Sequence, residues 1–367
     1  MSPSDAKSSF LFVTCQVGAE AAVKEELARR WPDVRAAFSR PGLITFKVPP
    51  DHPIRPDFDL PLVFARAAGL SLGKADGDDA QQRARSVWDL LGPRSVARVH
   101  VWPRDVKRAG EDDFEPAITP AAVEAREVIR QACPRPEMLN PDDRDWRLPA
   151  RSGDPVLDVI LVEPDQWWVG FHQVASEGGR WPGGMMALEP PPDVVSRAWL
   201  KMEEALRWSS LPIPPSSRVV ELGSAPGGAS QALLSHGLSV VGVDPAEMDP
   251  RVLANPNFTH LRHRAVEVRR REFRRVRWLT ADMNVAPSYT LDAVEAIVTH
   301  PEVNIRGMLI TLKLFQWEMA EQIPAYLDRV RSWGYNLVSA RQLQHDRQEI
   351  CVAALASPFI RKPIHRR

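Results

Sequence analysis

The chain has 367 residues, 44% of them hydrophobic, and its 47 basic residues (lysine and arginine) equal its 47 acidic ones in number. This length suffices for two or three domains with sizeable cores, and a net charge of zero excludes a generic polyanion-binding protein. No run of about 18 apolar residues occurs, and the polar start lacks the apolar core of a signal peptide. We therefore expect a cytoplasmic protein without a membrane segment.

The cysteines are few and scattered. Cys15, Cys133 and Cys351 form no CxxC pair and no Cys/His cluster, so we expect neither a disulfide framework nor a zinc site. Cys15 and Cys351 lie in apolar, strand-like runs, which is typical of small core residues.

The first half of the chain predicts small mixed α/β domains. SSFLFVTCQV, EAAVKEELARRW and LITFKV have the periodicities of a strand, a helix and a strand, which favours a ferredoxin-like domain over residues 1–78. Residues 79–175 predict a second small mixed α/β domain. They contain the strand-like VARVHVW, the helical AAVEAREVIRQA and the alternating PVLDVILVEPDQWWVGFHQ. Residues 176–193, rich in glycine and proline, predict an interdomain linker.

Aromatic residues cluster near the end of the second of these segments. Trp167, Trp168 and Phe171 could stack on exposed RNA bases. Aromatic residues in a strand more often belong to a core, so both interpretations are carried forward.

A glycine-rich turn is the most informative feature of residues 194–367. RVVELGSAPGGASQALL reads as an apolar strand entering a turn that opens a helix, and Gly223, Gly227 and Gly228 let the backbone approach a ligand closely. The next apolar run ends in Asp244, about 20 residues later, where nucleotide-binding α/β units hold ribose hydroxyls. The turn is not GxGxxG, and its proline argues against a dinucleotide. An ordinary tight turn in an α/β domain is the alternative.

Four charged residues lie at predicted strand ends or on an adjoining helix. Lys201 is central in the helical SRAWLKMEEALRW, and the other three occur in VRWLTADMN (Asp282), GMLITLKLF (Lys313) and QEICVAAL (Glu349). Such positions converge at the carboxyl edge of a doubly wound sheet, and lysine is rarely buried unless it is paired. We therefore predict a charged tetrad. The alternative is that Lys201 is a solvated helix residue and Lys313 marks a strand end.

Basic residues concentrate in LRHRAVEVRRREFRRVRW and in the tail RKPIHRR. Clusters of this kind supply salt-dependent contacts to phosphates, although charge runs are usually solvated faces. The cluster in the first segment consists of Arg262, Arg264, Arg269, Arg270, Arg271, Arg274, Arg275 and Arg277.

On these residues the chain resembles a known family. Lys201, Asp282, Lys313 and Glu349, arranged around an APGG turn, resemble the K-D-K-E tetrad of the FtsJ-type RNA ribose 2′-O-methyltransferases. SRAWLKMEEA, ELGSAPGGAS with VDPAEM, and RQLQHDRQEICV are similar to the RlmM family, which methylates a cytidine ribose in 23S rRNA. The resemblance is strong from residue 196 onward and weak before it, where FLFVTCQVGAEAAVKEEL and PLVFARAAGL carry it.

The resemblance implies an architecture, a cofactor and a partner. It implies a Rossmann-like methyltransferase domain over residues 194–367, with a mostly parallel sheet and helices on both faces, and a THUMP-type RNA-binding domain over residues 79–175. The cofactor would be S-adenosylmethionine and the partner RNA, specifically 23S rRNA, without a metal. The oligomeric state is not fixed by the sequence, and a monomer is favoured. The cofactor-binding residues would be Glu221, Gly223, Ser224, Pro226, Gly227, Gly228, Ala229, Asp244 and Asp282.

The resemblance also implies roles in an in-line displacement at the sulfonium methyl by a ribose 2′-oxygen. Lys313 is the candidate general base, with Lys201 nearby favouring loss of its proton. Asp282 would position Lys313 and hold the cofactor, while Lys201 and Glu349 would orient the 2′-hydroxyl.

Three positions depart from the family pattern. At the position of Glu221 the family has Asp, and at the position of Ala229 it has an aromatic residue. At the position of Arg264 it has an acid that can contact the adenine amino group. A cofactor pocket altered in this way leaves two alternatives open. One is a methyltransferase with another acceptor, such as tRNA or a small molecule, and the other is a non-catalytic RNA-binding relative.

Overall fold

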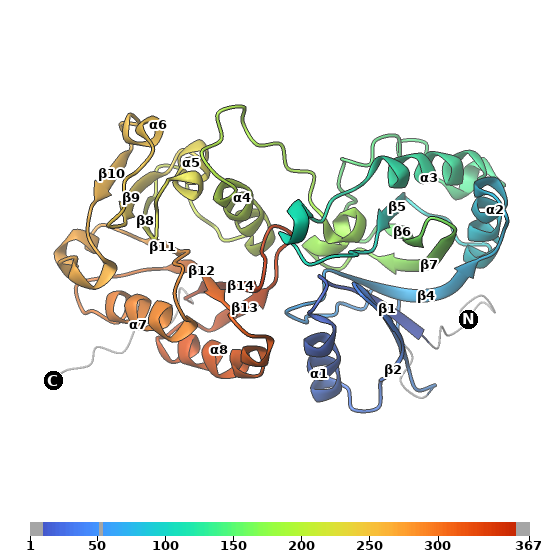
Figure 1. The fold of residues 1–367 in the computed structure, drawn as a ribbon, viewed down its shortest axis with the longest axis horizontal. Helices are drawn as coiled ribbons and strands as arrows, with labels where there is room; N and C mark the ends of the chain where they lie inside the picture. Colours follow the sequence, from blue (N-terminus) through green and yellow to red (C-terminus); the bar gives the residue numbers. More distant parts are fainter. Residues whose placement is uncertain (1–9, 51–53, 357–367) are drawn as a thin grey trace. The chain divides into compact units, whose positions relative to one another are not determined.

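The chain folds into two compact units, and the division falls between Ala187 and Leu188 (Figure 1). The computed structural model describes residues 10–50 and 54–356, and each unit is built around its own seven-stranded sheet. Among these residues, no helix combines the length and the apolar character that a membrane crossing requires. The basic tail RKPIHRR lies outside the described residues.

The first unit has a mostly antiparallel sheet in the order β2-β3-β1-β4-β7-β6-β5, in which β5 and β6 run parallel. Two of its helices begin at capping residues: before α2 the side chain of Asp79 accepts the N–H of Gln82, and before α3 that of Thr119 accepts the N–H of Ala122. Its elements are β1 (Phe10–Thr14), α1 (Glu20–Arg30), β2 (Arg35–Arg40), β3 (Leu43–Lys47), β4 (Ala67–Ala75), α2 (Ala80–Leu91), β5 (Arg98–Pro103), η1 (Glu111–Asp113), α3 (Pro120–Gln131), η2 (Pro136–Met138), β6 (Pro155–Glu163), β7 (Gln166–Gln173), η3 (Glu177–Arg180) and η4 (Pro182–Gly184).

A single sheet spans the two small domains expected at residues 1–78 and 79–175. Strand β4 pairs with β1 on one side and with β7 on the other, so both ranges share one compact unit. The expected linker 176–193 is also shorter than its composition indicated, because residues 176–187 belong to this unit. There Gly183 lies so close to the Trp102 ring that a Cβ would come within 2.6 Å of it. The remaining residues of this range, 188–193, are part of the second unit.

The aromatic residues of β7 mostly serve the core. Trp167 and Phe171 are buried. Trp168 is half-buried, stacks on Phe38 with ring centroids 5.5 Å apart, and donates to Ser71 Oγ at 2.8 Å. Base stacking by Trp167 or Phe171 is thus disfavoured, because their rings are already covered.

The second unit contains the mostly parallel sheet that the sequence predicts for residues 194–367. Its order is β10-β9-β8-β11-β12-β14-β13, and β14 runs antiparallel to both of its neighbours. Its elements are α4 (Ala198–Ser209), β8 (Arg218–Leu222), α5 (Gly228–Ser235), β9 (Ser239–Val243), α6 (Pro250–Leu253), β10 (Phe258–Leu261), η5 (Ala265–Glu267), η6 (Arg270–Phe273), β11 (Trp278–Ala281), α7 (Pro287–Val298), β12 (Gly307–Lys313), η7 (Trp317–Gln322), α8 (Ile323–Ser332), β13 (Leu337–Arg341) and β14 (Glu349–Leu355).

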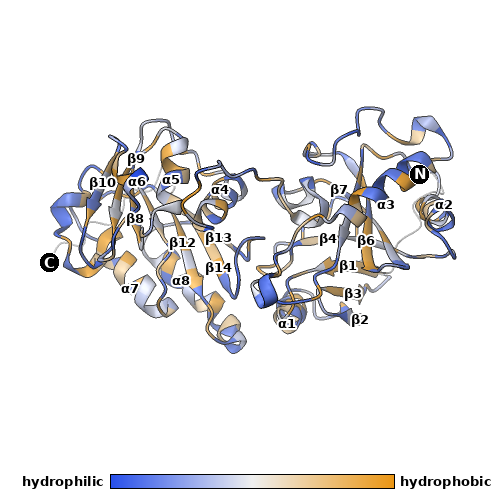
Figure 2. Ribbon diagram, turned by 45° about the horizontal axis from the view of Figure 1, so that its top comes forward, coloured by the Kyte–Doolittle hydropathy of each residue, from blue (hydrophilic) through white to orange (hydrophobic). Residues whose placement is uncertain are grey.

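The chain order reverses between β8 and β11, which makes the carboxyl edge of these two strands the switch point of the sheet. Helices lie on both faces, with α4 and α5 on one side and α7 and α8 on the other (Figure 1). In both units the strands carry most of the hydrophobic colour (Figure 2).

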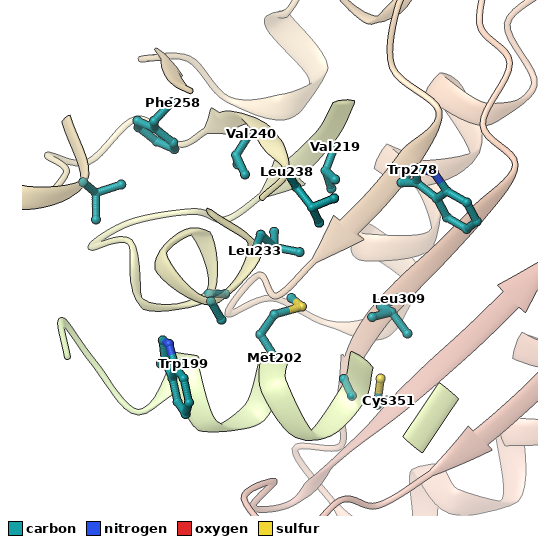
Figure 3. Packing of buried hydrophobic residues seen from close by; sticks show 14 of the residues in the cluster. Trp199, Met202, Val219, Leu233, Leu238, Val240, Phe258, Trp278, Leu309 and Cys351 are labelled. Atoms are coloured by element: carbon teal, nitrogen blue, oxygen red, sulfur yellow. The ribbon is translucent and has the colours of Figure 1, made fainter. Parts of the chain in front are cut away.

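Apolar packing holds helix α4 against the sheet, independently of the charged residues that the helix carries. Met202 extends from α4 toward the sheet, with Leu233 of α5 on one side and Leu309 of β12 on the other (Figure 3). Trp199 and Cys351 belong to the same buried cluster. Burying side chains of this size contributes about 1.5–3 kcal/mol each, so the position of α4 on the sheet is well determined.

Candidate active site

The structure brings Lys201, Asp282, Lys313 and Glu349 together at the carboxyl edge of the sheet. Asp282 directly follows β11 and Lys313 is the last residue of β12. Glu349 begins β14, and because β14 is antiparallel to β12, its first residue pairs with the last residue of β12. Lys201 reaches the same place from the first turn of α4.

The four side chains form a closed ring of ion pairs. Lys201 Nζ lies 2.7 Å from Asp282 Oδ2 and 2.8 Å from Glu349 Oε1. Lys313 Nζ lies 3.1 Å from Asp282 Oδ1 and also contacts Glu349 Oε2. Each ammonium therefore bridges both carboxylates, and each carboxylate uses one oxygen for each lysine. Two positive and two negative charges compensate each other in a site with little access to water.

Burial and charge act in opposite directions on these groups. Burial favours a neutral Lys201, but Asp282, Asp346 and Glu349 outweigh it and raise the pKa of Lys201 above its usual value. Burial likewise opposes ionisation of Asp282, but the two lysines outweigh it and lower the pKa of that carboxyl. Lys201 is thus held as an ammonium. Lys313 is more exposed, at 20% of its side chain against 12% for Lys201.

A second carboxylate network lies next to the ring, and its residues were not predicted from the sequence. Glu204, one turn beyond Lys201 on α4, accepts the N–H groups of Gln344 at 2.7 Å and of His345 at 3.1 Å. These bonds tie the loop before β14 to α4. The loop carries Asp346, a buried carboxyl that accepts the N–H of Leu343. The segment RQLQHDRQEICV indicated a family resemblance. Its residue spacing did not predict that Asp346 would be buried or that this loop would bind Glu204.

The glycines of the turn after β8 pack against the protein's own chain. A Cβ on Gly223 would come within 2.5 Å of the carbonyl oxygen of Asp282, and one on Gly228 within 2.2 Å of Ser196 Oγ. A Cβ on Gly227 would come within 2.8 Å of Val252, and the φ of +121° at Gly227 also favours glycine. The space beside these three glycines is therefore filled by the protein's own residues. The contact between Gly223 and Asp282 joins the turn to the ring.

Other residues expected to bind the cofactor surround this turn. The carboxylate of Asp244 accepts the N–H of Ala225 at 3.1 Å and that of Ala246 at 2.8 Å, so it shapes the turn and the loop after β9. Ser224 is buried next to Met248, and Pro226 precedes the first turn of α5. Ala229 belongs to the buried apolar cluster and also lines the small cavity beside Lys201 and Asp282.

Glu221 is buried at the end of β8, where the family has Asp. Its carboxyl accepts a hydrogen bond from Ser230 Oγ of α5. Burial, reinforced by the nearby carboxylates of Asp282 and Asp244, raises the pKa of Glu221 to about 8. At neutral pH Glu221 is therefore mostly protonated, and the longer side chain is accommodated as a neutral group.

The arginine cluster follows β10 and includes η5 and η6, and its members differ. Arg269, Arg271 and Arg274 expose 70%, 56% and 55% of their side chains, and each pairs with a glutamate. Arg270 instead donates to the carbonyl oxygens of Ala265 and Val268, which makes it part of the local fold. Arg264 and Arg275 are exposed.

The sequence is similar to known methyltransferases over nearly its whole length. Residues 194–328 match the FtsJ-like methyltransferase family. Ribosomal RNA large subunit methyltransferase M of Halorhodospira halophila is 30% identical over 354 residues, which cover 93% of this chain and 95% of that protein. The protein of the same name from Laribacter hongkongensis is 26% identical over 350 residues, or 89% of each chain.

Among solved structures, TrmN from Thermus thermophilus aligns with 94% of this chain and 99% of its own, at 16% identity. The TM-score of 0.34 is too low to support an argument about function.

Proposed function

Because this chain belongs to the ribosomal RNA large subunit methyltransferase M family, we propose that it methylates the 2′-oxygen of a ribose in 23S rRNA, with S-adenosylmethionine as methyl donor. The observation that carries the proposal is the closed ring of Lys201, Asp282, Lys313 and Glu349 beside the glycine turn. A ribose hydroxyl is a weak nucleophile at neutral pH, so such a reaction needs a group that takes its proton and groups that align it.

The residues present fit S-adenosylmethionine. When bound, this cofactor supplies an activated methyl group on a sulfonium. The turn after β8 leads into the first turn of α5, whose N–H groups lack helical partners, and Asp244 at the end of β9 offers a carboxylate for ribose hydroxyls. Asp282 adds an ionised carboxylate, which suits a cationic donor. Arg264 replaces the acid that the family uses near the adenine, and its exposure allows it to point into solvent.

The pairing within the ring supports a division of labour between the lysines. Three carboxyl groups surround Lys201 and keep it protonated, so Lys201 is suited to hold a hydroxyl in place by donating to it. Lys313 contacts two of these carboxyl groups and is more exposed, and we assign it as the general base. Bound S-adenosylmethionine would supply the methyl group, and Lys313, once in its amine form, would take the proton that the ribose 2′-hydroxyl loses. Glu349 and Asp282 keep both lysines aligned.

Recognition of RNA is assigned to two regions. The exposed arginines after β10 offer phosphate contacts in the same unit as the ring. The first unit is proposed as the second region, on the basis of its weaker THUMP-like resemblance.

The test is transfer of labelled methyl groups to 23S rRNA isolated from a strain that lacks the enzyme. We expect one methyl group per rRNA molecule and an alkali-resistant dinucleotide, because a methylated 2′-oxygen blocks alkaline cleavage. Total tRNA from the same strain is the control acceptor. Methylation of tRNA alone would replace the proposed substrate, and cofactor binding without transfer to either RNA would contradict the proposed reaction.

The non-catalytic alternative predicts a different result. Calorimetry with S-adenosylmethionine should show one binding site per chain, whereas a scaffold that retained only the fold should show none.

A further inference from the structure

A buried cluster of two histidines and an aspartate lies in the first unit, far in sequence from the ring. His100 is on β5, Asp158 on β6 and His172 on β7, three neighbouring strands. His100 pairs directly with Asp158, and His172 pairs with Val156, two residues from Asp158 on the same face. The sheet register therefore places all three side chains on one face.

These polar residues interrupt an otherwise apolar surface. On β6, Asp158 stands between Val156 and Ile160, and both neighbours belong to buried apolar clusters. His100, Asp158 and His172 are 3%, 1% and 8% exposed. Burying three polar side chains without full satisfaction is costly, so their presence here requires an explanation.

His100 is the least satisfied of the three. Neither of its ring nitrogens has a hydrogen-bond partner among the described residues, although the ring is almost completely buried. Its ring centroid lies 6.0 Å from that of His172. An imidazole in this position has two unused nitrogens, at least one of which carries a free lone pair.

His172 is held as a metal-ligating histidine usually is. Its Nε2 lies 2.8 Å from the carbonyl oxygen of Gly179, and its Nδ1 lies 2.6 Å from Asp158 Oδ2. Metal-bound histidines commonly donate one N–H to a backbone carbonyl, which fixes the ring and turns the other nitrogen toward the ion. Here that nitrogen is Nδ1, which is hydrogen-bonded to Asp158 Oδ2 and would exchange this bond for the ion.

The three ligand atoms, one from each side chain, lie within 4.8 Å of one another. Small side-chain rotations can bring them to the metal–ligand distances of about 2.0–2.2 Å found for zinc. Arg98 and Arg126 pair with Asp143, at 3.1 Å and 2.6 Å, and this pairing partly offsets the repulsion that their charges exert on a cation at His100.

We propose that His100, Asp158 and His172 bind one divalent transition-metal ion, with Zn²⁺ the best match to two imidazoles and a carboxylate. The ion ties β5, β6 and β7 together and, through Gly179, anchors the segment that carries η3 and η4. The fourth coordination position is left to water. The proposal is independent of the reaction assigned to the second unit.

The test is a Zn²⁺ titration of the full, untagged and metal-depleted chain against a chromophoric chelator. We expect one ion per chain, and His100→Gln should weaken this binding by at least about tenfold, since it removes a ligand. His263→Gln, which changes an exposed histidine in the other unit, should leave binding unchanged. No stoichiometric binding by the wild-type chain, or equal binding by both variants, would overturn the proposal.

A measurement on the wild-type chain keeps the test valid if His100→Gln fails to fold. Co²⁺ added to the metal-depleted protein should give the visible absorption of a four-coordinate nitrogen- and oxygen-ligated ion, and Zn²⁺ should displace it. Zn²⁺ should also raise the Tm of the first unit. A spectrum of hexa-aqua Co²⁺ together with an unchanged Tm would contradict the site.

Discussion

Lys201 and Lys313 contact the same two carboxylates, yet their surroundings differ. Lys201 comes from a helix packed on the sheet and is also influenced by the buried Asp346, whereas Lys313 ends a strand and is more exposed. Two lysines of identical chemistry are thereby prepared for different tasks. Lys201 is held as an ammonium by the surrounding carboxyl groups, and the more exposed Lys313 is the one assigned as the base.

Substitution of Lys313 tests this division. Lys313→Ala should lower methyl transfer by roughly 10²–10⁴-fold, the usual cost of losing a general base, while S-adenosylmethionine affinity changes little. Lys313→Arg should fail almost as severely, because a guanidinium remains protonated. Lys74→Arg, at an exposed position on β4, is the matched control. An active Lys313→Arg enzyme would leave Lys313 with an electrostatic role only.

Glu221 links the stability of the second unit to pH. Its pKa is about 8 in the folded chain and near 4.5 when exposed, so the folded state retains a proton that the unfolded state loses. Below pH 4.5 both states are protonated and the group has no effect. As the pH rises from 4.5 to 8, the free energy of unfolding therefore falls, by at most about 1.4 kcal/mol per pH unit from this group.

Glu221→Gln should remove this dependence, because the amide resembles the protonated acid. Urea unfolding of both proteins at pH 5, 6, 7 and 8 should show the variant gaining stability relative to wild type as the pH rises. Glu247→Gln changes an exposed acid of the same unit and serves as control. Parallel pH profiles for Glu221→Gln and wild type would show that Glu221 is ionised in the folded state.

The arginines of the segment after β10 have different surroundings. Arg270 is half-buried and holds two backbone carbonyls, whereas Arg271, Arg274 and Arg275 extend into solvent. Only the exposed members are free to reach phosphates without disturbing the short helices. The segment thus combines a structural arginine with a candidate RNA surface.

Replacing Arg271, Arg274 and Arg275 together with glutamine should weaken RNA binding. The slope of log affinity against log salt should flatten by up to about one unit per lost phosphate contact. The control triple is Arg207, Arg251 and Arg331, which are exposed on separate elements of the same unit. Equal salt slopes for the two triples would identify the segment as an ordinary solvated surface.

The division of the chain into two compact units places the proposed cofactor chemistry and one of the two proposed RNA-binding regions in the second unit, and the other RNA-binding region in the first. All four ring residues and the glycine turn belong to the second unit, which has its own sheet and its own buried cluster. A unit with a complete core is able to fold independently.

A fragment of residues 188–367 should therefore fold with one cooperative thermal transition and bind S-adenosylmethionine within about threefold of the full chain, which is below 1 kcal/mol. Its KM for 23S rRNA should rise at least about tenfold if the first unit contacts RNA. The full chain, assayed in parallel, provides the reference. An unchanged KM would assign RNA binding to the second unit alone.

Local patterns in the sequence were sufficient for the strands and helices that carry the glycine turn and the ring, and for the identity of the ring residues. Apolar periodicity placed β8, β9 and β12, and a lysine after an apolar strand indicated pairing, because an unpaired buried charge is costly. The glycines were correctly located at a turn that opens a helix, although these three pack against the chain itself.

The remaining features depend on contacts between distant segments, which no local pattern reports. Strand β4 joins two predicted domains because its hydrogen bonds reach β1 and β7, and Trp167 is buried where Arg83 of α2 lies over its ring. Glu204, Asp346 and the cluster at His100 acquire their roles only when strands and loops far apart in sequence meet. The pKa of Glu221 likewise follows from complete burial beside other carboxylates, a property of the folded environment rather than of the residue type.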